Sequence, residues 1–101
     1  MAGSPTKSAE APVLRREVTI VNRRGLHARA AAKFVKLATA FEAELTVSKK
    51  GVEVPGRSIM GLMMLAAAPG CRLELSASGP AAEQALTALA ELVTNKFDED
   101  G

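Results

Sequence analysis

The segment NRRGLHARAAAKF, residues 22–34, contains the one histidine of this 101-residue chain. His27 follows a glycine and directly precedes helix-forming residues, so it falls at or beside a helix N-cap. The first N–H groups of a helix lack internal partners, and the helix dipole is positive there, so such an end attracts anions. Arg29 follows the histidine, and Arg23 and Arg24 precede it, with guanidinium donors suited to phosphate oxygens.

An imidazole nitrogen is a competent nucleophile near neutral pH, so His27 could accept a phosphoryl group and hold it briefly. It could equally cap the helix or pair with a neighbour, and the residues alone leave both interpretations open. One histidine and one distant cysteine, Cys71, do not form a metal-ligand cluster, and no nucleophile elbow supports a Ser-His-Asp arrangement. We therefore expect no metal and no cofactor, and we rank an autonomous enzyme last.

Composition and charge narrow the class of protein. Apolar residues make up 48% of the chain and charged residues 24%, which is typical of a soluble globular protein. Up to Lys36 there are eight Lys/Arg against two acids, but no aromatic side chains interleave with the arginines, so we expect no nucleic-acid partner. The absence of a long apolar run and of a secretory signal, together with the lone cysteine, predicts a cytoplasmic protein without membrane insertion.

The chain reads as one domain over residues 15–97, between a disordered extension at 1–14 and a frayed acidic tail at 98–101. Alternating or β-branched runs predict strands at 17–21, 44–48, 52–54 and 72–78. Helical spacing predicts helices at 27–41, at 58–65 and after Gly79-Pro80, the last with a stripe of Ala82, Leu86, Leu89 and Val93. The fold class is α/β (α+β) in the order β-α-β-β-α-β-α. We expect an open-faced sandwich: a four-stranded antiparallel sheet with helices on one face.

The segments GLHARAAAKFV, SIMGLMML and ASGPAAEQALTAL together resemble HPr, the histidine-containing phosphocarrier family of the bacterial phosphoenolpyruvate-dependent phosphotransferase system. The resemblance covers about residues 15–96 and implies the same fold. It implies that enzyme I phosphorylates His27 on Nδ1, that Arg29 steadies the phosphoryl group, and that a IIA protein or domain receives it. The family usually has proline after that arginine, whereas Ala30 here restores an N–H in the first helical turn.

Ser58 opens the second predicted helix and suits its N-cap. In relatives regulated by HPr kinase/phosphorylase, a serine starting SIMG is the target, and Ser58 matches it. A phosphate there would add negative charge beside the surface that enzyme I approaches, so we expect it to slow phosphorylation of His27.

The same helix contains Ile59, Met60, Met63 and Met64, which cannot all be buried with Leu62 and Leu65 in so short a helix. Flexible methionines suit a surface that meets several partners in turn, although core filling is the alternative for any one of them. We assign phosphate and partner binding to Arg24, Gly25, Leu26, Ala28, Ala30, Arg57, Met60 and Met63.

The segments NRRGLHAR and SGP lean toward the nitrogen-related branch of the system, in which the phosphate chain ends on a regulatory IIA protein. The alternative function is therefore a regulatory binding module of that branch, gated by phosphorylation of His27 and Ser58. Nothing in the sequence requires more than a monomer.

Overall fold

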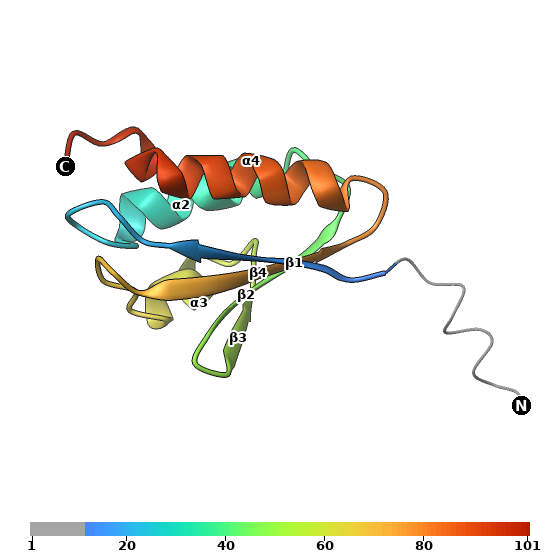
Figure 1. Ribbon diagram of the computed structural model, residues 1–101, viewed down its shortest axis with the longest axis horizontal. Coiled ribbons are helices and arrows are strands. Elements are labelled where there is room, and N and C mark those ends of the chain that lie inside the picture. The colour runs from blue at the N-terminus through green and yellow to red at the C-terminus, as the bar shows by residue number, and fades with distance from the viewer. Residues whose placement is uncertain (1–11) are drawn as a thin grey trace, which may run out of the picture.

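In the computed structural model, which describes residues 12–101, three helices and a four-stranded sheet form two layers (Figure 1). The strands are β1 (Leu14–Thr19), β2 (Glu44–Lys49), β3 (Val52–Pro55) and β4 (Arg72–Ser78). The helices are α2 (Ala28–Ala38), α3 (Ile59–Met64) and α4 (Ala82–Thr94), and a single turn, η1 (Lys96–Asp98), follows α4. Of the predicted extension at 1–14, residues 1–11 lie outside the described residues.

The sheet is antiparallel throughout, with the strand order β1-β4-β2-β3. β4 lies between β1 and β2, with Leu75 opposite Arg16 on one side and Val47 on the other. Alternation places Leu73, Leu75 and Ala77 on the buried face of β4, while Arg72 and Glu74 are exposed. The open-faced sandwich expected from the pattern is confirmed.

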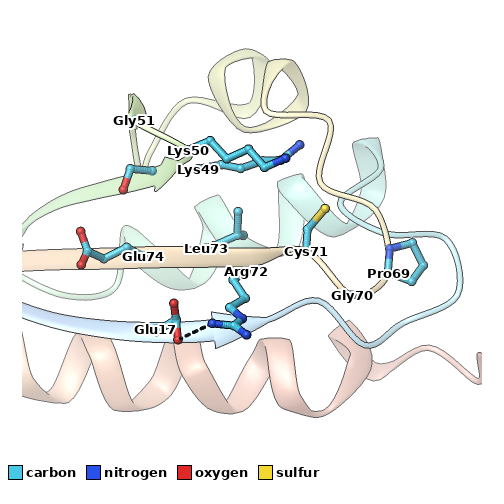
Figure 2. Close-up of a pocket in the computed structure, with 11 residues that line it drawn as sticks. Glu17, Lys49, Lys50, Gly51, Pro69, Gly70, Cys71, Arg72, Leu73 and Glu74 are labelled. Atoms are coloured by element: carbon cyan, nitrogen blue, oxygen red, sulfur yellow. Dashed lines mark ion pairs between the residues drawn. The ribbon is translucent and has the colours of Figure 1, made fainter.

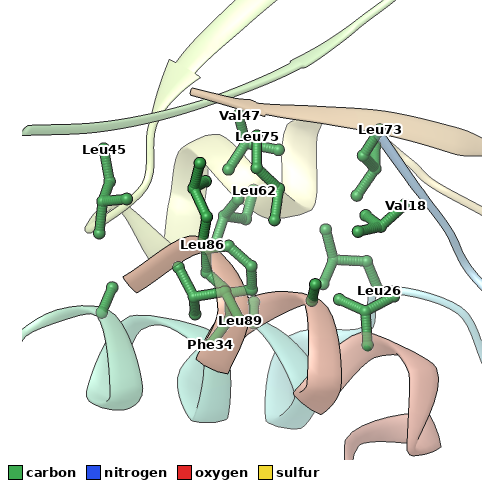
Figure 3. Packing of buried hydrophobic residues seen from close by; sticks show 14 of the residues in the cluster. Val18, Leu26, Phe34, Leu45, Val47, Leu62, Leu73, Leu75, Leu86 and Leu89 are labelled. Atoms are coloured by element: carbon green, nitrogen blue, oxygen red, sulfur yellow. The ribbon is translucent and has the colours of Figure 1, made fainter. Parts of the chain in front are cut away.

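The hydrophobic core lies between the inner face of the sheet and the helices (Figure 3). Phe34 of α2, Leu62 of α3 and Leu89 of α4 are all fully buried, which joins the three helices to one core. The predicted stripe of α4 is confirmed, because Ala82, Leu86, Leu89 and Val93 are all buried.

The first strand and the first helix have ends that differ from the sequence prediction by more than one residue. The first strand runs over Leu14–Thr19 instead of 17–21, since its extent is set by pairing with Arg72 to Ala77 of β4. The first helix ends at Ala38 instead of Phe41, and the Arg57 guanidinium donates to the carbonyls of Ala38, Phe41 and Ala43 at 3.3, 2.7 and 2.9 Å. Both boundaries depend on contacts with residues distant in sequence.

The segment after α4 also differs from the expected frayed tail. The three residues of η1 all have positive φ, and they turn the chain back so that the C-terminus lies beside the loop that leads into α2 (Figure 1). Phe97 is fully buried, and its carbonyl accepts a hydrogen bond from Lys33 Nζ at 2.7 Å. The Gly101 carbonyl accepts from the Arg23 N–H at 2.8 Å. The acidic tail is therefore packed against the start of α2.

Candidate functional site

The loop before α2 holds His27 in place through its backbone. Gly25 has φ +69°, and a Cβ there would lie 2.5 Å from the Ala67 carbonyl oxygen, so only glycine fits without displacement. The Leu26 N–H donates to that same carbonyl at 2.9 Å. His27 is then the N-cap residue of α2, with extended backbone and with its carbonyl accepting the Ala31 N–H at 2.8 Å. The position expected from the sequence is confirmed.

The imidazole does not cap the helix with its side chain, because no hydrogen bond joins it to the first N–H groups. Its Nε2 instead pairs with Glu99 Oε2 of the C-terminal segment. The His27 side chain is 16% exposed, so the ring is neither walled off nor fully in solvent. Among the described residues, Nδ1 has no hydrogen-bond partner, and Nε2 is the only ring nitrogen that is paired.

Glu99 receives a second hydrogen bond from a buried side chain. Asn22 is fully buried, and its Nδ2 donates to Glu99 Oε1 at 3.0 Å and to the Gly25 carbonyl at 2.8 Å. Burial alone would raise the pKa of the Glu99 carboxyl. Hydrogen bonds from Asn22 and His27, with the charges of His27 and Arg24, outweigh burial and lower this pKa below its ordinary value of 4.5. The carboxylate is therefore ionised at neutral pH.

A surface pocket of 390 Å³ opens beside this pair. Basic side chains on one side and the acidic tail on the other line it: Arg23, Arg24, Arg29, Lys33, Asp98, Glu99, Asp100 and Gly101. The predicted arginines therefore do gather near the histidine. Arg29 and Arg24 are both exposed, so their guanidinium groups are available to an anion.

Other predicted site residues contribute through their backbone or lie elsewhere. The sequence assignment of partner binding to Leu26 and Ala30 is corrected for their side chains, which are buried at 6% and 0% exposure and do not reach the surface. Gly25 is buried, whereas Ala28 is exposed in the first turn of α2. Arg57 binds the carbonyls at the far end of α2 and does not lie beside His27.

Ser58 and the methionines lie on α3, which packs against α2. Ser58 is the N-cap of α3, with its Oγ accepting the Gly61 N–H at 2.9 Å, so the predicted cap is confirmed. Leu62 and Leu65 are buried, as expected. Four neighbours form the apolar patch, with exposed fractions of 42% for Ile59, 72% for Met60, 41% for Met63 and 79% for Met64.

A second pocket, of 690 Å³, lies away from the histidine (Figure 2). Lys49 and Lys50 extend from the β2–β3 turn toward the loop that contains Pro69 and Gly70, and Arg72 pairs with Glu17 at 3.9 Å. Lys49 Nζ is already bound to the Leu65 carbonyl at 2.8 Å. None of the predicted site residues lines this pocket, so the larger of the two pockets is not the candidate functional site.

Two residues at the site, Asn22 and Glu99, were missed by sequence reasoning. Asn22 directly follows the apolar end of the predicted strand 17–21, and Phe97 is an aromatic residue just ahead of an acidic run. These were the available signals, because a buried amide needs hydrogen-bond partners, and an aromatic residue near the end of the chain favours packing of that segment against the core.

Residues 12–101 contain no group of three or more His, Cys, Asp or Glu side chains placed to hold a metal ion. None of the helices in this part of the chain has the length and apolar character needed to cross a bilayer.

The sheet, the helices and a partly exposed histidine at the start of α2 together define an open-faced α/β sandwich with an imidazole at a helix N-terminus. Residues 14–95 match the family model described as PTS HPr component phosphorylation site. The chain belongs to the HPr family of phosphocarrier proteins.

Individual relatives agree with this assignment. The chain is 49% identical over 84 residues to phosphocarrier protein HPr of Pseudomonas aeruginosa, covering 82% of this chain and 93% of the relative. It is 44% identical over 86 residues to phosphocarrier protein NPr of Shewanella violacea, covering 85% and 94%. The crystal structure of HPr from Thermoanaerobacter tengcongensis superposes with a TM-score of 0.83 at 40% identity, covering 87% of this chain and 99% of that one.

Proposed function

We propose that this chain is a phosphocarrier that accepts a phosphoryl group from phosphorylated enzyme I on His27 Nδ1 and passes it to a IIA protein or domain. The observation that carries the proposal is the free Nδ1 of a partly exposed imidazole at the start of α2. The first N–H groups of that helix and the Arg29 guanidinium are the donors that would hold the phosphoryl oxygens. In this proposal the chain is a substrate of its partner phosphotransferases and turns over nothing alone. Phosphoryl transfer requires only one copy of the chain, and it takes place in the cytoplasm.

The apolar patch of Ile59, Met60, Met63 and Met64 supports a shared docking surface for both partners. A carrier must bind each partner only briefly, and adaptable methionine side chains suit such contacts. α3 packs against α2, so a protein seated on the patch would lie on the helix pair that holds His27.

The test is transfer of labelled phosphate from phosphoenolpyruvate through enzyme I to this chain, followed by addition of a IIA protein. We expect an acid-labile, base-stable label on the wild type that moves to the IIA protein. A His27→Ala variant should take up none. A wild-type chain that stays unlabelled, while an established HPr is labelled in parallel, would refute the carrier function.

A second candidate is a regulatory binding module of the nitrogen-related branch, gated by phosphorylation of His27 and Ser58. The likeness to an NPr favours it, together with the partial exposure of Ser58 at the start of α3. HPr kinase/phosphorylase is the enzyme class that would modify Ser58. We expect Ser58→Asp to accept phosphate from enzyme I more slowly than Ser58→Asn, which keeps a cap without the charge. Equal rates for the two variants would argue against this control.

A further inference from the structure

The C-terminal segment returns to the histidine through a conformation that L-residues seldom adopt. Lys96, Phe97 and Asp98 have φ of +60°, +53° and +64°, the left-handed region in which a Cβ crowds the following carbonyl. Such conformations persist only where surrounding contacts impose them, and they cluster at functional sites. Here the burial of Phe97 and the Lys33 hydrogen bond hold the turn.

The turn delivers Glu99 to one particular ring nitrogen. Its Oε2 meets Nε2 of His27, on the opposite side of the ring from Nδ1. A carboxylate only accepts hydrogen bonds, so this contact requires the proton of the neutral ring to be on Nε2. Nδ1 then carries the lone pair.

Asn22 fixes the carboxylate in turn. Its Nδ2 donates to Glu99 Oε1, while its Oδ1 is buried and has no hydrogen-bond partner within residues 12–101. A buried polar atom left unpaired is unfavourable, and an apolar side chain would avoid it. The role of the Asn22 amide is therefore to donate two hydrogen bonds, one to Glu99 and one to the Gly25 carbonyl of the loop that holds His27.

We infer that Glu99, held by Asn22, is a positioning residue that fixes the Nε2–H tautomer of His27 and so keeps Nδ1 ready to accept a phosphoryl group. This inference rests on the proposed carrier function for its consequence, but the tautomer itself does not depend on any partner. Histidines that bind metals are oriented in the same way by a carboxylate on the second ring nitrogen.

Phosphoryl transfer from enzyme I to Nδ1 then needs no accompanying proton transfer. The Nδ1 lone pair forms the bond to phosphorus while the bond from phosphorus to enzyme I breaks, and its electron pair stays on enzyme I. The ring keeps its Nε2 proton and becomes cationic, with the Glu99 carboxylate opposite the new charge. On donation the P–N electrons return to Nδ1, and a neutral imidazole is left. From the other tautomer, Nδ1 would first have to lose a proton.

The test uses the full chain labelled with ¹⁵N in its single histidine, at a pH where the ring is neutral. In the wild type we expect one ring nitrogen with the shift of a protonated nitrogen, assigned to Nε2, and the other unprotonated. Glu99→Gln keeps the size of the side chain, but its amide can either accept or donate a hydrogen bond to the ring. The ¹⁵N shifts of the two ring nitrogens should therefore move toward each other. Asp100→Asn is the matched control, because it removes the same charge from the same tail without touching the ring, and it should match the wild type.

Transfer kinetics give the second readout. Glu99→Gln should accept phosphate from enzyme I about 10-fold more slowly, the lower end of the effect of removing a histidine's carboxylate partner in metal sites. Asn22→Leu, which removes the donor to Glu99, should shift the tautomer in the same direction. An unchanged tautomer or a wild-type rate in Glu99→Gln would overturn the inference. A wild type that is never labelled would instead refute the carrier function and leave the tautomer measurement standing.

Discussion

At the scale of single residues, the loop that presents His27 depends on Gly25. Gly25→Ala would need both a left-handed backbone and a Cβ 2.5 Å from the Ala67 oxygen. Gly51 is a matched control, because it has φ +85° but nothing within 4 Å of an added Cβ. Gly51→Ala should lower the free energy of unfolding by about 1–2 kcal/mol from backbone strain alone. Gly25→Ala should lower it by more, as measured by urea denaturation followed by circular dichroism. Equal losses would show that the close approach to Ala67 is unimportant.

Glu99 gives a residue-scale prediction about pH. Its pKa is lower in the folded chain than its ordinary value of 4.5, since the bonds from Asn22 and His27 outweigh burial. The unfolded chain therefore takes up this proton at a higher pH than the folded chain does. The stability from Glu99 is present at neutral pH and is lost as the pH falls below about 4.5 through the folded pKa.

The measurement compares urea denaturation of the wild type, Glu99→Gln and Asp100→Asn at neutral and acidic pH. Glu99→Gln should lose less stability on acidification than the wild type does. Asp100→Asn should follow the wild type, because Asp100 has no ion pair or hydrogen-bonded side-chain partner within residues 12–101. Parallel profiles for the wild type and Glu99→Gln would contradict this account of Glu99.

His27 could be placed at a helix start from its neighbours alone, because Gly25 and the helical spacing after it are local signals. Its partner could not. Glu99 lies 72 residues away, and the contact requires the left-handed turn at η1, for which the sequence offers no glycine. An acidic run at a chain end is typical of a solvated tail, and this one returns because Phe97 is buried and its carbonyl accepts the Lys33 hydrogen bond.

At the scale of elements, α3 combines a capped start with an exposed apolar face. Met60→Glu should weaken binding to enzyme I with little change in melting temperature, because Met60 is 72% exposed. Val13→Glu is the matched control, since Val13 is 50% exposed just before β1 and shares no pocket with the residues of the patch. Calorimetric titration with enzyme I measures the affinities. Equal weakening by both variants, or none by Met60→Glu, would remove the patch from the docking surface.

The type and order of the main elements could be predicted because each has a clear period and a turn signal at its ends. The ends of β1 and α2 could not. The end of α2 is bound by Arg57, whose sequence position suggested a phosphate contact instead. A guanidinium that satisfies backbone carbonyls from another element leaves no periodic signal.

At the scale of the whole molecule, the fold brings two distant segments together at His27 and packs α3 against the helix that follows. The loop before α2 supplies His27 and Asn22, the tail supplies Glu99, and α3 presents its apolar patch on the helix next to α2. The sheet contributes by placing β1 and β4 side by side, so that α2 and α4 cover one face. A chain of this size therefore holds a partly exposed imidazole and an exposed apolar patch on two helices that pack against each other.

The most direct measurement of the central claim is the ¹⁵N spectrum of the single histidine after phosphorylation by enzyme I and phosphoenolpyruvate. With one histidine in the chain, only two ring-nitrogen signals exist to be assigned. We predict coupling to ³¹P at Nδ1 alone, with Nε2 still protonated. Coupling at Nε2, or phosphate uptake without coupling at either nitrogen, would contradict the claim that His27 Nδ1 carries the phosphoryl group.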